Sequence, residues 1–197
     1  MIKAYGLISG NIASGKTKAL NEFIKILTKK GIPHYGFTEL CIHQDGKRVG
    51  YDMLTNMNGK EERIPFVRLR KKILNDGMIF SFDLKAVNKI ERIFKSISYP
   101  KEPSILIFDE YGKQESKLKG QWPNIYYLIN YYQTQKIPFY PIFSSRKQNV
   151  PALSRSLQKN FGITKNDCLM NLPCSSKTVH DCFENFISKY NKLKNFS

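Results

Sequence analysis

The sequence has few acidic residues, few cysteines and no long hydrophobic run. Asp and Glu together number 16 against 32 Lys and Arg, which gives a formal net charge of +16. No apolar run approaches the ~20 residues that a membrane-spanning helix needs. A strand and then a glycine-rich loop are expected directly after the N-terminus, so we do not expect a signal peptide. By elimination, we expect a soluble cytoplasmic protein without a membrane partner.

The four cysteines are Cys41, Cys168, Cys174 and Cys182, and none of them belongs to a C-x-x-C pair. The last three gather with His180 near the C-terminus, but their spacing matches no common zinc pattern. In a cytosolic chain such residues are typically reduced thiols that behave as small, partly buried side chains. We therefore do not expect a structural metal site among them.

The excess of positive charge has two interpretations. It is typical of proteins that bind nucleic acid or polyphosphate. However, the lysines are scattered along the chain without a dense block, so a lysine-rich solvated surface explains the charge equally well. Hydrophobic residues make up 41% of the sequence, which argues against disorder. The length suits one domain, residues 1–197, with a sizeable core.

Residues 10–17 read Gly-Asn-Ile-Ala-Ser-Gly-Lys-Thr and fit the phosphate-loop (Walker A) pattern G-x-x-x-x-G-K-S/T at every fixed position. A short apolar strand is expected before the loop, over residues 4–8, and an amphipathic helix after it, through about residue 30. A chance glycine-rich turn is the alternative, but it would not require this order of strand, loop and helix. The residues expected to bind the nucleotide are Gly10, Asn11, Ile12, Ala13, Ser14, Gly15, Lys16, Thr17 and Lys18.

The residue types of this loop suit the binding of phosphate. Glycines let the backbone wrap around a phosphate chain, with its N–H groups pointing inward as an anion nest. The helix that begins near Lys16 adds the positive end of its dipole. Lys16 is expected to reach the β- and γ-phosphates, and the Thr17 hydroxyl is expected to hold Mg²⁺.

The rest of the chain alternates expected strands and helices. Two β-rich runs flank an Asp45-Gly46 turn and predict a hairpin inserted near residues 35–54. The polar, basic residues 55–75 are expected to form a surface loop with room for short elements of structure. Strands are expected at 78–82, 104–108, 139–143 and 168–172, and helices at 86–97, 122–135, 150–161 and from 179 onward. This alternation predicts an α/β fold, with a mostly parallel sheet covered by helices on both faces.

Four apolar residues, 105–108, run directly into Asp109-Glu110, as in a Walker B strand. Ligands of parallel sheets bind at the carboxyl ends of the strands, so these acids should emerge beside the phosphate loop. Asp109 is then the second metal ligand, opposite Thr17, and Glu110 is placed to activate a water as a general base. An ordinary solvated acid pair is the alternative. The phosphate loop in the same chain favours the catalytic interpretation.

The charge that builds on the γ-phosphate during transfer also needs cations. The arginines considered for this role are Arg68, Arg70, Arg146 and Arg155. Arg146 directly follows an apolar strand, although a surface position is the more common one for each of the four. Ser144 and Ser145 end the same strand and are candidates to contact the γ-phosphate or the attacking water.

Three segments together resemble the P-loop nucleoside-triphosphatase family, of the thermophilic and cancer-related type. They are residues 10–17, Gly36-Phe37-Thr38-Glu39 with residues 46–52, and residues 107–115. Their order and spacing are similar to those of the family's phosphate loop, hairpin and acidic strand end, and the resemblance covers roughly residues 3–145. It implies a RecA-like fold and Mg²⁺-dependent hydrolysis of ATP, GTP and other nucleoside triphosphates to the diphosphate and phosphate. By this resemblance Lys16, Thr17, Asp109 and Glu110 have the roles given above, and Glu115 also matches.

The sequence therefore predicts a Mg²⁺-dependent nucleoside-triphosphatase with Lys16 and Glu110 as catalytic residues. Two alternatives stay open. A nucleotide or nucleoside kinase shares the phosphate loop but needs an acceptor pocket and an arginine lid, for which Arg63, Arg68 and Arg70 are candidates. A basic, nucleic-acid-associated ATP-binding switch is suggested by the net charge, and a steep salt dependence of RNA or DNA binding would identify it.

Overall fold

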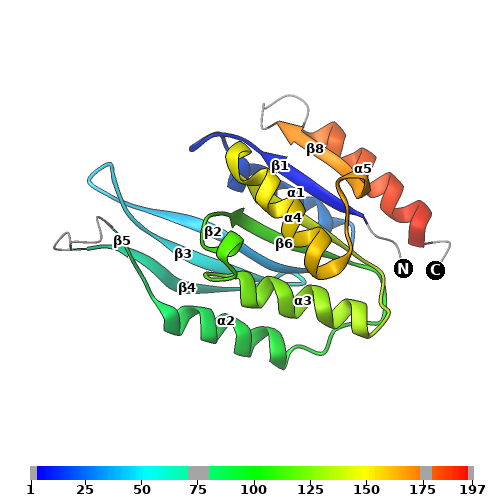
Figure 1. The fold of residues 1–197 in the computed structure, drawn as a ribbon, viewed down its shortest axis with the longest axis horizontal. Helices are drawn as coiled ribbons and strands as arrows, with labels where there is room; N and C mark the ends of the chain where they lie inside the picture. Colours follow the sequence, from blue (N-terminus) through cyan, green and yellow to red (C-terminus); the bar gives the residue numbers. More distant parts are fainter. Residues whose placement is uncertain (1–3, 71–79, 174–178, 195–197) are drawn as a thin grey trace.

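The structure is a computed structural model that describes residues 4–70, 80–173 and 179–194. Its centre is a mixed eight-stranded sheet in the order β5-β4-β3-β2-β6-β7-β1-β8 (Figure 1). The strands are β1 (Tyr5–Ser9), β2 (His34–Gln44), β3 (Lys47–Met57), β4 (Lys60–Leu69), β5 (Phe80–Phe82), β6 (Ser104–Tyr111), β7 (Phe139–Ser145) and β8 (Cys168–Pro173). The α-helices are α1 (Lys16–Lys29), α2 (Leu84–Ser96), α3 (Trp122–Thr134), α4 (Val150–Phe161) and α5 (Val179–Lys194), and the short 3₁₀ helices are η1 (Glu115–Lys117), η2 (Lys147–Asn149) and η3 (Lys165–Asp167).

The five strands β2, β6, β7, β1 and β8 pair in parallel and are covered on both faces. Strand β6 shows why its apolar run is continuous. Leu106 and Phe108 pack into one core with α2, α3 and α4, whereas Ile105 and Ile107 pack into a second core with α1 and α5. Both faces of the strand therefore need apolar side chains. The predicted α/β fold, with helices on both faces of a largely parallel sheet, is confirmed.

Strands β2 to β5 extend the sheet by antiparallel pairing. The predicted hairpin is β2 and β3, and its turn residues Asp45 and Gly46 have φ of 50° and 71°. The prediction of a surface loop over residues 55–75 is wrong where the structure describes them, because β3 continues to Met57 and β4 follows. The turn between them is Asn58-Gly59, with φ of 55° and 86°. Residues 71–79, which include part of the strand predicted at 78–82, lie outside the described residues.

Gly36 shows why the hairpin joins the parallel sheet where it does. This residue of β2 pairs with Ile107 of β6 and has φ of 141°. A Cβ atom at position 36 would lie 1.9 Å from the Ile107 carbonyl oxygen, so only glycine allows this approach of the two backbones. The approach brings the following residues of β2, as far as Glu39, beside the end of β6.

The carboxyl ends of β1, β7 and β6 meet at one edge of the sheet. Strand β7 lies between the other two, and its Ser144 and Ser145 pair with Ile8 and Ser9 of β1. The phosphate loop and the acids of β6 are therefore separated by one strand, whose last residues lie between them. Among the residues that the structure describes, no helix has the length and apolarity needed to cross a membrane.

Candidate active site

The loop between β1 and α1 leads directly into the N-terminus of a helix, an arrangement that suits phosphate binding. Ala13 and Gly15 have φ of 58° and 88°, and the Gly10 N–H donates to the Ser145 carbonyl at 3.2 Å. Helix α1 begins at Lys16, so the first N–H groups of the helix face the loop. The Lys16 side chain is only 3% exposed, and its ammonium group donates to the Asn11 carbonyl at 3.1 Å. The loop therefore surrounds its own lysine.

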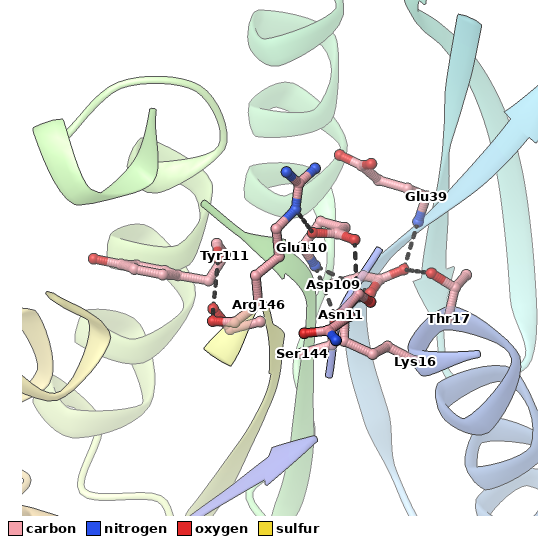
Figure 2. Close-up of polar contacts among 10 residues, drawn as sticks. Asn11, Lys16, Thr17, Glu39, Asp109, Glu110, Tyr111, Ser144 and Arg146 are labelled. Atoms are coloured by element: carbon pink, nitrogen blue, oxygen red, sulfur yellow. Dashed lines mark hydrogen bonds and ion pairs between the residues drawn. The ribbon is translucent and has the colours of Figure 1, made fainter. Parts of the chain in front are cut away.

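Asp109 joins the phosphate loop, β2 and β7 through hydrogen bonds (Figure 2). Its Oδ2 accepts from the Thr17 hydroxyl at 2.7 Å and from the Glu39 N–H at 3.1 Å. Its Oδ1 accepts from the Ser144 hydroxyl and from the Glu110 N–H. Burial raises the pKa of Asp109, although the hydrogen bonds from Ser144, Glu39 and Thr17 oppose that rise. The carboxylate is thus fixed in position by partners from three parts of the chain.

Glu110 projects from a bulge at the end of β6. Phe108 pairs with Phe143 of β7 and Tyr111 pairs with Ser145, so two residues of β6 lie opposite Ser144 alone. Glu110 is one of these two residues and has φ of 53°. This left-handed conformation costs a non-glycine residue about 1–3 kcal/mol and is typical of functional sites.

The bulge directs the Glu110 carboxylate toward the phosphate loop. Glu110 Oε1 lies 3.3 Å from Lys16 Nζ, and its Oε2 lies 4.0 Å from Arg146 Nε. Figure 2 shows the Arg146 side chain reaching over Glu110 from the end of β7. The predicted pair of catalytic residues, Lys16 and Glu110, thus lies in direct contact.

The oxygen atoms of Thr17 and Asp109 are suitable ligands for Mg²⁺. Both are hard donors, one a hydroxyl and one a carboxylate, and they already lie 2.7 Å apart beside the phosphate loop. In the described part of the chain, no three His, Cys, Asp or Glu side chains cluster closely enough to form a separate metal site. Cys174, one of the C-terminal cysteines, lies outside the described residues.

The structure separates the arginine candidates. Arg146 lies at the site, whereas the Arg68 guanidinium on β4 binds the buried Asp52 on β3 at 2.5 Å. Arg63 binds the other oxygen of the same carboxylate, also at 2.5 Å. Arg155 lies on an exposed position of α4, and Arg70 follows the end of β4. Arg63 and Arg68 are therefore structural residues of the antiparallel extension, which weakens the arginine-lid hypothesis.

The two serines of β7 are both fully buried and bond to β6. Ser144 accepts from the Glu110 N–H at 2.9 Å and donates to Asp109, while Ser145 donates to the Tyr111 carbonyl at 2.8 Å. The sequence made these hydroxyls candidates to contact the γ-phosphate or the attacking water. In the structure they bond to the acidic end of β6.

Sequence reasoning gave no role to two glutamates that the structure brings close to the site. The partly buried Glu39 orients Asp109 through its backbone, and its carboxyl has a pKa well above the usual value because of burial and the nearby Asp109 and Glu110. Glu115 accepts from the Gly112 and Gln121 N–H groups at 3.0 and 2.9 Å and so holds together the loop after β6. Both residues belong to the motifs that carried the family resemblance, which is the signal that pointed to them.

Comparison with known proteins agrees with this geometry. A family model described as NTPase matches residues 6–166, from the first strand through α4. The chain belongs to the NTPase family. The match includes the phosphate loop, the hairpin and the acidic end of β6.

Two relatives of this NTPase chain are similar to it in sequence or in fold. The cancer-related nucleoside-triphosphatase homolog of Mus musculus is 29% identical over 118 residues, which span 55% of the chain and 60% of that protein. The solution structure of a human cancer-related nucleoside triphosphatase superposes with a TM-score of 0.65 at 16% identity, covering 96% of this chain and 98% of that one. The second likeness confirms the RecA-like P-loop fold of the chain.

Proposed function

We propose that the chain is a Mg²⁺-dependent nucleoside-triphosphatase, which hydrolyses ATP, GTP and other nucleoside triphosphates to the diphosphate and phosphate. One observation carries the proposal: Lys16 and Thr17 of the phosphate loop contact Glu110 and Asp109 of a strand end that is 92 residues away in sequence from Thr17. Family membership and the name of the mouse relative support the same activity.

In the proposed mechanism, the loop N–H groups and the dipole of α1 bind the polyphosphate. Lys16 exchanges its contacts with Asn11 and Glu110 for the β- and γ-phosphates. When bound, Mg²⁺ would neutralise charge on the phosphates, and Thr17 and Asp109 are the residues that would hold it. Arg146 is placed to stabilise the charge that develops at the γ-phosphate.

Glu110 is the proposed general base. Once Lys16 has turned to the phosphates, the Glu110 carboxylate can accept a proton from a water that attacks the γ-phosphorus. The bulge conformation and the hydrogen bond from its N–H to Ser144 fix the direction of this side chain. Asp109 cannot easily take the same role, because both of its oxygens already accept hydrogen bonds.

Release of free phosphate tests the proposal. The purified chain is incubated in turn with ATP, GTP, CTP and UTP, with Mg²⁺ or with EDTA, and with or without RNA. We expect release from several triphosphates that requires Mg²⁺ and does not change with RNA. No release under any condition would contradict the proposal, and release only with RNA would favour the nucleic-acid-associated switch.

A further inference from the structure

A cavity of about 450 Å³ lies next to Glu110. Glu110 lines this cavity and also the small pocket of the phosphate loop, together with Lys16 and Thr17. One water needs only about 10–15 Å³ of such space, so the cavity beside the proposed base is much larger than a single attacking water requires. Its size lies within the range of about 300–1,000 Å³ that is typical of small-molecule sites.

One wall of the cavity comes from the antiparallel extension of the sheet and is aromatic. The rings of Tyr51 and Phe80 lie 6.2 Å apart between centroids, and the Arg48 guanidinium lies 5.2 Å from the first centroid and 5.6 Å from the second. Phe82, on the same strand as Phe80, also lines the cavity and is 42% exposed. Two partly buried rings beside a guanidinium group, with the exposed ring of Phe82 close to them in the lining, suit the stacking of a flat aromatic ligand.

Another part of the lining is polar and comes from the segments that follow β6 and β7. The carboxamides of Gln114, Gln148 and Asn149 line it, together with the Arg146 side chain. A carboxamide both donates and accepts hydrogen bonds, which matches the edge of a nucleobase. The cavity thus combines a stacking surface with groups that recognise a heterocycle.

We propose that this cavity binds a second substrate of the nucleoside class and that the γ-phosphoryl group passes to a hydroxyl of that substrate. The inference rests on the proposed function, because it uses the same phosphate loop and Glu110. Glu110 takes the hydroxyl proton, the hydroxyl oxygen bonds to the γ-phosphorus, and the bond from that phosphorus to the β,γ-bridging oxygen breaks. The products are a nucleoside monophosphate and the nucleoside diphosphate.

The proposed general base, Glu110, indicates which group of the acceptor is phosphorylated. A phosphate group is already deprotonated at neutral pH and can attack without a base, whereas a hydroxyl needs one in the transition state. Glu110 lines both pockets, which is the position that such a base requires. The acceptor is therefore expected to be the nucleoside and not its monophosphate.

The test is a transfer assay with ATP labelled at the γ-phosphate and Mg²⁺. Adenosine, guanosine, cytidine, uridine and thymidine, and then their monophosphates, are added as separate acceptors, and the labelled products are separated. We expect label on at least one nucleoside, rising to saturation with its concentration. Label found only as free phosphate would overturn this inference and leave the proposed hydrolysis intact, and label on monophosphates alone would overturn the choice of a hydroxyl. Absence of both phosphate release and transfer would contradict the proposed function itself.

Substitutions in the lining test whether the acceptor binds in this cavity. Phe80→Ala removes one stacking ring and is expected to raise the acceptor KM about five- to tenfold. Hydrolysis without an acceptor, measured in the same sample, reports whether the variant is folded. Leu84→Ala is the matched control, since Leu84 is 73% exposed and does not line the cavity. An acceptor KM that stays unchanged in Phe80→Ala would overturn the placement of the acceptor.

Discussion

The ammonium group of Lys16 lies 3.3 Å from the Glu110 carboxylate and 3.1 Å from the Asn11 carbonyl. The cation proposed to bind phosphate and the base proposed to activate water therefore neutralise each other before nucleotide is present. A polyphosphate chain carries more negative charge than one carboxylate and is expected to draw Lys16 away. Nucleotide binding would then release the base at the place where the reaction occurs.

Lys16→Ala is expected to weaken nucleotide binding by about 10- to 150-fold, the equivalent of losing charge-assisted hydrogen bonds worth about 1.5–3 kcal/mol. Titration calorimetry with a non-hydrolysable triphosphate measures the affinity. Lys29→Ala is the control, because Lys29 lies on an exposed position in the last turn of the same helix. Equal affinities for the wild type and Lys16→Ala would show that the lysine does not bind phosphate.

Ser144 and Ser145 form a matched pair of buried hydroxyls. Ser144→Ala removes the bonds to Asp109 and to the Glu110 N–H, whereas Ser145→Ala removes only the bonds to the Tyr111 and Arg146 carbonyls. Each substitution is expected to lower the free energy of unfolding by about 1–3 kcal/mol. Only Ser144→Ala is expected to lower kcat as well, on the order of 10- to 100-fold, because the base is no longer held in position. Equal kcat values in the two variants would show that Ser144 has a purely structural role.

Substitutions of Arg146 and Arg68 are expected to have different effects, the first on kcat and the second on stability. Arg146→Ala is expected to lower kcat by about 10³-fold or more if Arg146 stabilises the transferring phosphoryl group as arginine fingers do. Arg68→Ala is expected to keep its kcat and to lose stability, because Arg68 binds Asp52 and not the site. Steady-state kinetics and urea unfolding of both variants check this. A larger fall in kcat for Arg68→Ala would restore the arginine-lid hypothesis.

The pair of arginines on Asp52 makes the stability of the β3–β4 pairing depend on pH. Burial tends to raise the pKa of Asp52, but the hydrogen bonds from Arg63 and Arg68 outweigh it, so the pKa lies below the usual 3.8. A lowered pKa in the folded state means that the stabilisation is present above pH 3.8 and is lost as the pH falls through the lowered value. Asp52→Asn is therefore expected to cost about 1–3 kcal/mol at neutral pH and progressively less below about pH 3.8. Urea unfolding across this range tests it, and a difference that does not vary with pH would contradict it.

The phosphate loop and the acids of β6 could be predicted from the sequence because each is a local pattern. Residues 10–17 carry their own strand, turn and helix signals, and residues 105–110 show the buried strand and its acidic end. The hairpin at Asp45-Gly46 was local in the same way. Such features need no knowledge of the partners that surround them.

Strand β4 was missed because its stability comes from packing in the folded protein and not from its local sequence. Its charged residues and its internal Pro65 argue against a strand. The burial of Ile64, Phe66 and Val67 against α2 outweighs them, and the proline is accommodated where the pairing with β3 shifts register. The Asn58-Gly59 turn was the available signal, since this dipeptide is typical of two-residue hairpins.

The choice among site residues also depended on the fold. Glu39, Asp109 and Ser144 come from three strands that are far apart in sequence, and only the order β2-β6-β7 brings them together. From the sequence, Arg146 was one of four candidate arginines, marked only by its place after an apolar strand. It could not select this residue, because the selection depends on β7 lying between β1 and β6.

The central claim is that Glu110 activates the attacking nucleophile, and Glu110→Gln tests it most directly. The glutamine keeps the size of the side chain but cannot accept the proton. The measurement is phosphate release from ATP with Mg²⁺ at saturating nucleotide, with nucleotide affinity measured in parallel. We predict a fall in kcat of about 10²- to 10⁴-fold with nucleotide affinity maintained. Normal turnover in Glu110→Gln would contradict the assignment.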